Sequence, residues 1–330
     1  MPLFCPICNG AESASVAATH VSPLNDQTYT LRSCLNCGIQ YWTPRVILPE
    51  FYSGEVFGSY VSQHLAAGRL QPWHRPFFEA PPPVGRILDV GCGAGAFLAA
   101  TRTLGFEAWG TDLDRRSVEQ ARNRRGLENV HALTLDEFVD RYCSQGLRFD
   151  VISFFEVLEH QDDPRHFLQK ARSILRPGGR IVGSVPNRDR WAADRDRATE
   201  ACHGDFPPHH FFWFSERSLQ FLLRRELLQE VQISRSAATL MEVSAWLEAN
   251  LLGSISGQVK RRLKAGLMGE RMKHLGVTQM NVGDHPLRAA MLSALRRARD
   301  LAFLPIAAAI RGSYNRRGAH LYFTGRRAVE

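Results

Sequence analysis

Four of the seven cysteines form two pairs, Cys5/Cys8 and Cys34/Cys37, and two residues separate the members of each pair. Four thiolates in this spacing match the tetrahedral coordination that Zn²⁺ prefers in structural sites. The odd number of cysteines argues against a disulfide framework. We therefore expect residues 1–45 to form a zinc ribbon whose metal stabilises a short segment, with contact to nucleic acid as the alternative role.

A glycine-rich segment, LDVGCGAGAF, contains three alternating glycines, Gly91, Gly93 and Gly95. They let the backbone turn tightly and approach a ligand, and the following helix offers free N–H groups. The pattern also fits the G-x-G-x-x-G/A motif of dinucleotide-binding proteins, with Asp112 where a ribose-binding acid belongs. Asp89, however, places a carboxylate beside the turn, where it can hold donors around an ammonium group and would repel a pyrophosphate. This charge favours S-adenosylmethionine (SAM) over NAD.

Histidines and aromatic residues crowd the segment HGDFPPHHFFWFS, which contains His203, His209 and His210. A histidine near its ordinary pKa can deprotonate or orient a hydroxyl group at neutral pH. We expect His209 or His210 to be the catalytic base. The alternative is that one of the two only hydrogen-bonds the loop.

Alternating strands and helices must position these residues. The expected strands are 86–90, 107–111, 129–133, 149–155 and 180–185, and the expected helices are 94–104, 115–125, 136–143 and 163–176. Asp114 and Gly126 mark the start and the end of the second helix. This alternation predicts an α/β fold with a Rossmann-like, largely parallel sheet and helices on both faces.

Four motifs in this region, LDVGCGAG, GTDLD, FDVISFFEVLEH and LRPGGRIVGSVPN, stand in an order and spacing that resemble the class I SAM-dependent methyltransferases. They are especially similar to the branch that contains the ubiquinone-biosynthesis O-methyltransferases, and the resemblance covers residues 86–223. The segment CPIC…CLNCGIQYWTPR…EFYSGEVFGSY is similar to the N-terminal part of bacterial methyltransferases that act on sugars or cell-surface glycans.

The resemblance implies a set of cofactor-binding positions. Asp89 and the three glycines would line the methionine and ribose of SAM, and Asp112 would accept the ribose hydroxyls. The remaining implied positions, at the ribose, at the adenine and at the methionine end, are Leu113, Thr134, Leu135, Phe155 and Glu156. Glu156, Glu159 and His160 could also gather as metal ligands, or Glu159 and His160 could buttress the next turn.

The rest of the chain divides around this core. Residues 46–85 read as an aromatic-rich linker or lid, 86–240 as the SAM-binding core, 241–317 as a helical insertion and 318–330 as a final strand of the core sheet. The insertion is basic, with Lys260, Arg261, Arg262 and Lys264 in one cluster and Arg296, Arg297 and Arg299 in another. It could cover the substrate, contact anionic lipid or phosphate, or form a plain amphipathic helix pair.

Composition narrows the class of protein. The 330 residues carry a net charge of +8 and are 44% hydrophobic, which fits a globular protein. We see no secretory signal, and the apolar stretch 301–310 is too short to span a bilayer. We therefore expect a cytoplasmic protein, peripheral to the membrane at most.

The motifs together predict a SAM-dependent methyltransferase that acts on oxygen of a small molecule or saccharide, including a lipid-linked one. C- or N-methylation of a nucleotide sugar is the nearest alternative. A zinc-ribbon nucleic-acid-binding protein or an RNA methyltransferase is less favoured, because the basic residues lie far along the chain from the cysteines and no aromatic-basic RNA signature is present. Asp89 and the downstream motifs argue against an NAD-dependent oxidoreductase.

Overall fold

The computed structural model divides the chain into two compact units. The first comprises Met1–Asp189, Cys202–Ser236 and His320–Glu330, and the second comprises Arg190–Ala201 and Ala237–Ala319. The structure describes residues 4–10, 14–47, 69–190, 205–226, 228–236 and 318–329, and from the second unit also 243, 244, 247, 294, 297, 298, 301–306, 308 and 309. His203 and the cluster from Lys260 to Lys264 lie outside the described residues.

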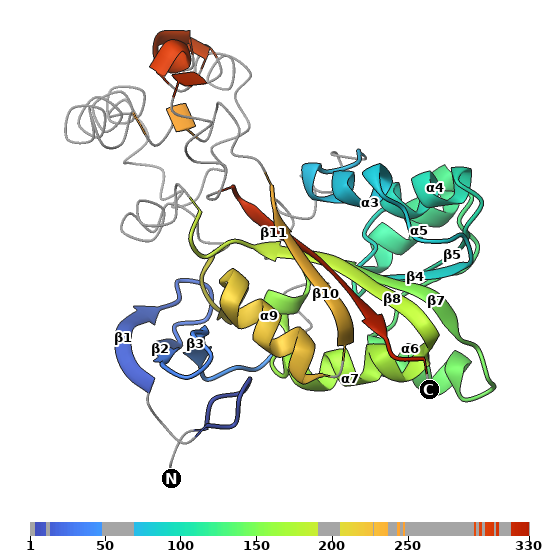
Figure 1. Ribbon diagram of the computed structural model, residues 1–330, viewed down its shortest axis with the longest axis horizontal. Helices are drawn as coiled ribbons and strands as arrows, with labels where there is room; N and C mark the ends of the chain where they lie inside the picture. Colours follow the sequence, from blue (N-terminus) through green and yellow to red (C-terminus); the bar gives the residue numbers. More distant parts are fainter. Residues whose placement is uncertain are drawn as a thin grey trace, which may run out of the picture. The chain divides into compact units, whose positions relative to one another are not determined.

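The first unit is built on a seven-stranded sheet with the order β10-β11-β8-β7-β4-β5-β6 (Figure 1). Its strands are β4 (Arg86–Val90), β5 (Glu107–Thr111), β6 (Val130–His131), β7 (Phe149–Phe155), β8 (Leu175–Pro186), β10 (Leu228–Arg235) and β11 (His320–Arg327). The five strands from β8 to β6 are mutually parallel, whereas β11 runs antiparallel to both β8 and β10. This antiparallel edge departs from the parallel sheet of dinucleotide-binding folds.

Helices cover both faces of this sheet (Figure 1). They are α3 (Arg75–Glu79), α4 (Ala96–Thr103), α5 (Arg115–Arg125), α6 (Leu135–Phe138), α7 (Pro164–Ile174) and α9 (Glu216–Arg225). Neighbouring strand residues point to opposite faces, so that Ile87 packs with α3, α4 and α5 while Leu88 packs with α6, α7 and α9. The predicted α/β fold with helices on both faces is confirmed.

Most predicted elements are present. The helices expected over 94–104 and 163–176 are shorter, Ala96–Thr103 and Pro164–Ile174, and three other elements differ more. The third strand shortens to two residues. The helix expected over 136–143 becomes α6 followed by a π-helix, Val139–Cys143. The strand expected from Arg180 begins earlier, at Leu175, because Leu175 already pairs with Phe149 of β7, so Pro177-Gly178-Gly179 lies inside β8.

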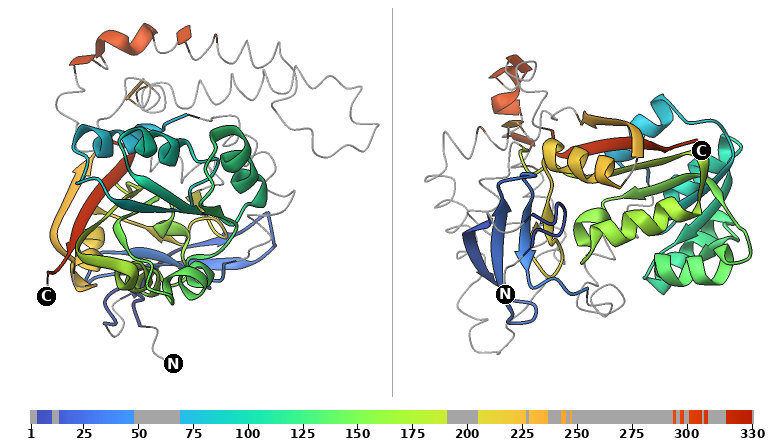
Figure 2. Two further views of the ribbon diagram at one scale, coloured as in Figure 1. Left: turned by 90° about the vertical axis from the view of Figure 1, so that its right-hand side faces the viewer. Right: turned by 60° about the horizontal axis from the view of Figure 1, so that its bottom comes forward.

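A second, antiparallel sheet contains the N-terminal strands β1 (Ala14–Val21), β2 (Thr28–Cys34) and β3 (Gln40–Thr43). Its fourth strand, β9 (Phe212–Trp213), comes from the segment after β8, which lies beside the N-terminal strands (Figure 2). Tyr41 of β3 pairs with Phe212. The backbone N–H of Trp42 also donates to the carbonyl of Phe211 at 2.9 Å. The N-terminal segment is therefore joined to the histidine-bearing segment by backbone hydrogen bonds.

Part of the segment expected to be a linker packs into the core. A 3₁₀ helix, Pro72–His74, runs directly into α3. The ring of Phe77 is buried and meets Phe97 edge-on with centroids 5.0 Å apart. Among the described residues, no helix is long and apolar enough to cross a membrane.

Candidate functional site

The glycine-rich turn joins the end of β4 to the start of α4, at the edge where the parallel strands end. All three glycines have positive φ, +76° at Gly91 and Gly95 and +51° at Gly93. A Cβ at Gly91 would lie 2.6 Å from Val157 and one at Gly95 would lie 2.5 Å from Leu127, whereas nothing lies within 4 Å of a Cβ at Gly93. Gly91 and Gly95 thus permit close packing, and Gly93 leaves open space for a ligand.

Asp89 is buried beneath this turn, with 3% of its surface exposed. The hydroxyl of Ser153 donates to its Oδ1 at 2.7 Å. Burial raises the pKa of Asp89 to about 8, and the nearby charge of Asp112 adds to the effect. Without a cation nearby, the Asp89 side chain therefore keeps its proton at neutral pH.

Asp112 directly follows β5 and is hydrogen-bonded to the glycine-rich turn. Its Oδ2 accepts from the backbone N–H of Gly93 and its Oδ1 from that of Asp114, both at 2.8 Å. Burial raises the pKa of Asp112, and these backbone hydrogen bonds oppose the shift. Each carboxylate oxygen has a second lone pair, so Asp112 can still accept a ligand hydroxyl. Leu113 beside it is half-buried.

Three other predicted cofactor positions lie at the ends of the neighbouring strands. Thr134 caps α6 by accepting from the backbone N–H of Glu137, and Leu135 is buried. The hydroxyl of Thr134 is therefore used within the protein. Phe155 is buried at the end of β7, and its ring packs against Phe97 with centroids 4.7 Å apart.

Glu156 adopts a left-handed backbone conformation with φ +56°, which is unusual for a residue with a side chain. Its Oε1 accepts from the hydroxyl of Ser184 at 2.6 Å. Its Oε2 lies 3.7 Å from Nε2 of His320, at the start of β11. Because β11 is antiparallel to β8, its first residue reaches the same sheet edge as the carboxyl ends of the parallel strands.

Several residues at this edge escaped the sequence analysis: Trp73, His74, Ser153, Ser184 and His320. The Trp73 and His320 rings lie 4.8 Å apart, and His74 meets the edge of Phe155 at 4.6 Å. Burial lowers the pKa of His74 to about 4, so this imidazole stays neutral. Ser153 could have been found from the sequence, because it is a polar residue within the apolar strand segment FDVISFF and therefore needs a buried hydrogen-bond partner.

A second cluster joins the EVLEH motif to the histidine-bearing segment. One ring nitrogen from each of His160, His209 and His210 lies within 4.8 Å of the other two. Glu159 Oε1 lies 3.8 Å from Nε2 of His160 and 3.9 Å from Nε2 of His210. The structure thus brings both predicted base candidates next to His160, and His210 also faces the buried carboxyl group of Glu159.

Both carboxylate oxygens of Glu159 are buried without a hydrogen-bond partner in the described part of the chain. Burial raises the pKa of Glu159 well above its ordinary value, and the charge of Glu156 raises it further. The Nδ1 atoms of the two histidines are held from behind, His160 by the carbonyl of His209 at 2.6 Å and His210 by Asp205 at 3.3 Å. The Nε2 atoms therefore face Glu159 in fixed orientations.

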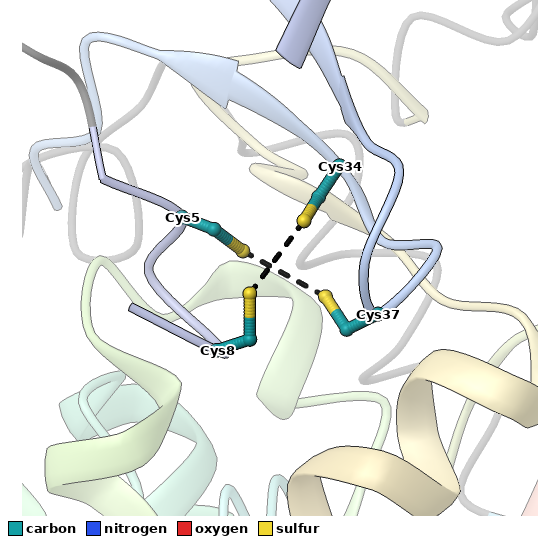
Figure 3. Close-up of side chains that lie close together, drawn as sticks. All are labelled: Cys5, Cys8, Cys34 and Cys37. Carbon is teal, nitrogen blue, oxygen red and sulfur yellow. Dashed lines mark hydrogen bonds between the residues drawn. The ribbon is translucent and has the colours of Figure 1, made fainter. Parts of the chain in front are cut away.

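The four N-terminal cysteines lie in one group (Figure 3). Cys5 Sγ is 3.7 Å from Cys37 Sγ, and Cys8 Sγ is 3.6 Å from Cys34 Sγ. The hydrogen bond between the first two thiols lowers the pKa of Cys5 to about 5 and raises that of Cys37. All four predicted metal ligands thus converge: Cys5 and Cys8 come from the N-terminal turn, Cys34 ends β2, and Cys37 lies in the turn that follows.

Comparison with known proteins places this site in a family. The family model described as a methyltransferase domain matches residues 62–228. A ubiquinone biosynthesis O-methyltransferase from Idiomarina loihiensis is 34% identical over 112 residues, 32% of this chain and 43% of that protein. One from Cereibacter sphaeroides is 33% identical over 131 residues, 39% of this chain and 51% of that protein. The chain spans about half the length of the curated relatives it matches.

Among solved structures, a SAM-dependent methyltransferase from Archaeoglobus fulgidus is 16% identical with a TM-score of 0.43, over 84% of this chain and 97% of that chain. The family model alone covers half of the sequence and contains the glycine turn, Asp112 and the EVLEH motif. The chain therefore belongs to the methyltransferase domain family, as its resemblance to the class I SAM-dependent enzymes predicted.

Proposed function

We propose that this protein transfers the methyl group of SAM to a hydroxyl oxygen of a small molecule or saccharide. The observation that carries the proposal is the glycine turn, open above Gly93 and flanked by the carboxyl groups of Asp89 and Asp112. The curated relatives, which are named as O-methyltransferases of ubiquinone biosynthesis, support oxygen as the accepting atom. C- or N-methylation of a nucleotide sugar is the alternative.

The two carboxyl groups suit the two ends of SAM. Asp112 offers two acceptor oxygens, as neighbouring ribose hydroxyls require. Asp89 lies below the turn, where its charged form would stabilise the ammonium group of the methionine moiety and would repel a pyrophosphate. We infer that Gly91, Gly93, Gly95, Leu113, Thr134, Leu135, Phe155 and Glu156 complete the cofactor site.

The sulfonium of SAM supplies an activated methyl group, so the chain's own residues chiefly align the acceptor and take its proton. The O–CH₃ bond forms as the S–CH₃ bond breaks, and the hydroxyl proton passes to a base. We propose His210 or His209 as that base. Asp205, behind Nδ1 of His210, would stabilise the imidazolium that forms.

A second role for the same cluster is favoured by the unpartnered carboxylate of Glu159. Cations bonded to nitrogen and oxygen at about 2.1 Å hold adjacent ligand atoms roughly 3.0–3.4 Å apart. The distances of 3.8 Å and 3.9 Å from Glu159 to His160 and His210 are longer, so the three side chains would close in around a cation. A metal-bound histidine usually has its other ring nitrogen hydrogen-bonded to a carboxylate or a backbone carbonyl. Nδ1 of His210 and Nδ1 of His160 have these two kinds of partner. We propose that Glu159, His160 and His210 can bind a divalent cation.

Binding of Mn²⁺ tests this second role, because Mn²⁺ prefers oxygen and nitrogen ligands and leaves the cysteine group aside. We expect the wild type to bind Mn²⁺ in electron paramagnetic resonance titrations, and Glu159→Gln to lose that binding. Glu119→Gln, on the exposed side of α5, is the matched control. If all three proteins bound Mn²⁺ equally, or if the wild type bound none, the proposed cation site would be refuted and only the role of the histidines as base would remain.

We further propose that the cysteine group holds a structural Zn²⁺. Zinc–sulfur bonds of about 2.3 Å in a tetrahedron place the sulfurs about 3.8 Å apart, close to the distances of 3.7 Å and 3.6 Å. The cysteines of this group would fix the turn that carries β3, and β3 pairs with β9 next to the histidine-bearing segment.

Calorimetric titration with S-adenosylhomocysteine tests the central proposal. NAD serves as the control ligand and Asp112→Ala as the control protein. We expect the wild type to bind S-adenosylhomocysteine and not NAD, and the variant to bind at least about tenfold more weakly, since a hydrogen bond to a charged group contributes roughly 1.5–3 kcal/mol. Binding of NAD, or of neither ligand, would refute the cofactor assignment.

A further inference from the structure

A buried imidazole lies beside the glycine-rich turn, on the segment that precedes β4. His74 ends the 3₁₀ helix Pro72–His74 and leads directly into α3, which packs beside α4 (Figure 1). Its ring centroid lies 5.1 Å from that of Phe97 and 4.6 Å from that of Phe155. Phe97 belongs to the first turn of α4, and Phe155 ends β7, the strand next to β4. His74 therefore lies at the edge where the cofactor positions gather.

A backbone hydrogen bond decides where this imidazole carries its proton. The N–H of Gln71, the residue before the 3₁₀ helix, donates to Nδ1 of His74 at 3.1 Å. A neutral imidazole has one ring proton, so a hydrogen-bond acceptor at Nδ1 leaves that proton on Nε2. Burial lowers the pKa of His74 to about 4, which keeps the ring neutral at neutral pH. His74 therefore offers one N–H donor, at Nε2.

The acidic groups at this edge suit a cation. Asp89, Asp112 and Glu156 bring three carboxyl groups to the ends of neighbouring strands. Nε2 of His320 lies 3.7 Å from Oε2 of Glu156, so this second imidazole already faces an acid. The methionine part of SAM carries both an ammonium group and a carboxylate. The acids suit the ammonium group, but they would repel the carboxylate, which needs a hydrogen-bond donor on another side of the site.

The glycine-rich turn uses most of its backbone donors internally. Three of its N–H groups donate to backbone carbonyls and one donates to Asp112. They belong to Gly91, Cys92, Gly95 and, for the bond to Asp112, Gly93. The turn is therefore held by its own hydrogen bonds, which favours a side-chain donor for the carboxylate of the ligand.

We propose that His74 is a further cofactor-binding residue, whose Nε2–H donates to the carboxylate of the methionine part of SAM. This inference rests on the proposed function, because it assigns one more contact within the same cofactor site. A donor on the side of His74 and acids on the other side would hold the two charged groups of the methionine part in opposite directions. Such two-sided binding would fix the position of the sulfonium for methyl transfer.

Two ligands that differ in this carboxylate alone, SAM and decarboxylated SAM, test the proposal in calorimetric titrations. We expect the wild type to bind SAM more tightly. His74→Phe keeps a ring between Phe97 and Phe155 but lacks the N–H. It should bind SAM about tenfold more weakly or worse, because a hydrogen bond to a charged group is lost, and decarboxylated SAM with unchanged affinity. His74→Gln, whose amide also donates, should keep most of the affinity for SAM. His166→Phe, at an exposed position of α7, is the matched control.

A measurement on the wild type keeps the test independent of how well the variants fold. With ¹⁵N-labelled histidine, SAM should shift the Nε2 resonance of His74, which is assigned by its loss in His74→Gln, and decarboxylated SAM should leave it nearly unchanged. Equal losses for both ligands in His74→Phe, or a preference for SAM that survives in this variant, would overturn the role of His74 alone. If the wild type bound neither ligand, the proposed function would be refuted together with it.

Discussion

The proton on Asp89 makes the affinity for the cofactor depend on pH. Asp89 is almost fully buried, and burial raises its pKa to about 8. At neutral pH the empty site therefore holds a protonated carboxyl group, with Ser153 against its Oδ1. If the ammonium group of the ligand sits beside Asp89, its positive charge favours the carboxylate, and binding must release this proton.

The size of the effect follows from that linkage. Below the pKa of the empty site, each pH unit shifts the balance by about 1.36 kcal/mol, which is about tenfold in affinity. Affinity for S-adenosylhomocysteine should rise with pH, because ionising Asp89 costs less as the pH approaches 8. Between about pH 6 and pH 8 the gain reaches up to about a hundredfold, provided that the pKa in the complex lies below 6. Above pH 8 the curve should flatten.

Calorimetry in two buffers with different ionisation enthalpies counts the released protons directly. We expect close to one proton per ligand near pH 7 in the wild type and none attributable to this site in Asp89→Asn, whose binding should be weaker and nearly flat with pH. An affinity that does not change with pH in the wild type would refute the reasoning. So would the same slope in Asp89→Asn.

Four further predictions each rest on a single position. Gly93→Ala should fold with a loss of roughly 1 kcal/mol for its left-handed backbone yet bind S-adenosylhomocysteine much more weakly, because its methyl group enters open space. Gly95→Ala should instead lower the melting temperature more, since its methyl group meets Leu127. His74, with its pKa lowered to about 4 from 6.5, stays neutral while the unfolded chain takes up a proton, so stability should fall as pH drops from 6.5 to 4. The loss should be about 3 kcal/mol in urea titrations, and His74→Gln should flatten it. Cys37→Ser should bind less zinc by elemental analysis and melt at a lower temperature than Cys143→Ser, a buried cysteine outside the group.

Local signals explain which elements the sequence predicted well. The bounds of β4, β5, β7 and α5 agree with the expected ranges. For α5 the reason is visible at both ends, because Asp114 accepts from the N–H groups of Arg116 and Ser117, and Gly126 takes the left-handed conformation. Short apolar strands and capped helices depend on neighbouring residues only, so the sequence alone specifies them.

Contacts between distant segments left no local signal. The strand β9 has two residues, and only its pairing with β3, about 170 residues earlier in the chain, makes it a strand. The cluster of Glu159, His160 and His210 likewise depends on how two loops meet. The sequence predicted Asp89 and Asp112 because the strand–turn–helix unit fixes their spacing from the glycines. It did not predict Ser184 and His320, because they reach the site from the distant strands β8 and β11.

The same long-range pairing links the two proposed metal groups, the cysteines and the set of Glu159, His160 and His210. The cysteines hold the turn before β3, and Arg188 and Arg217 tie that turn to the core through the carbonyls of Gly38 and Asn36 at 2.7 Å and 2.9 Å. The carbonyl of Glu159 accepts a hydrogen bond from the N–H of Phe211. The carbonyl of Phe211 in turn accepts from the N–H of Trp42, which lies in β3. Backbone hydrogen bonds therefore run unbroken from the ribbon to Glu159. If zinc stabilises the ribbon, its removal should loosen the histidine-bearing segment before it affects the glycine turn, because β4 and β5 form no pair with the N-terminal sheet.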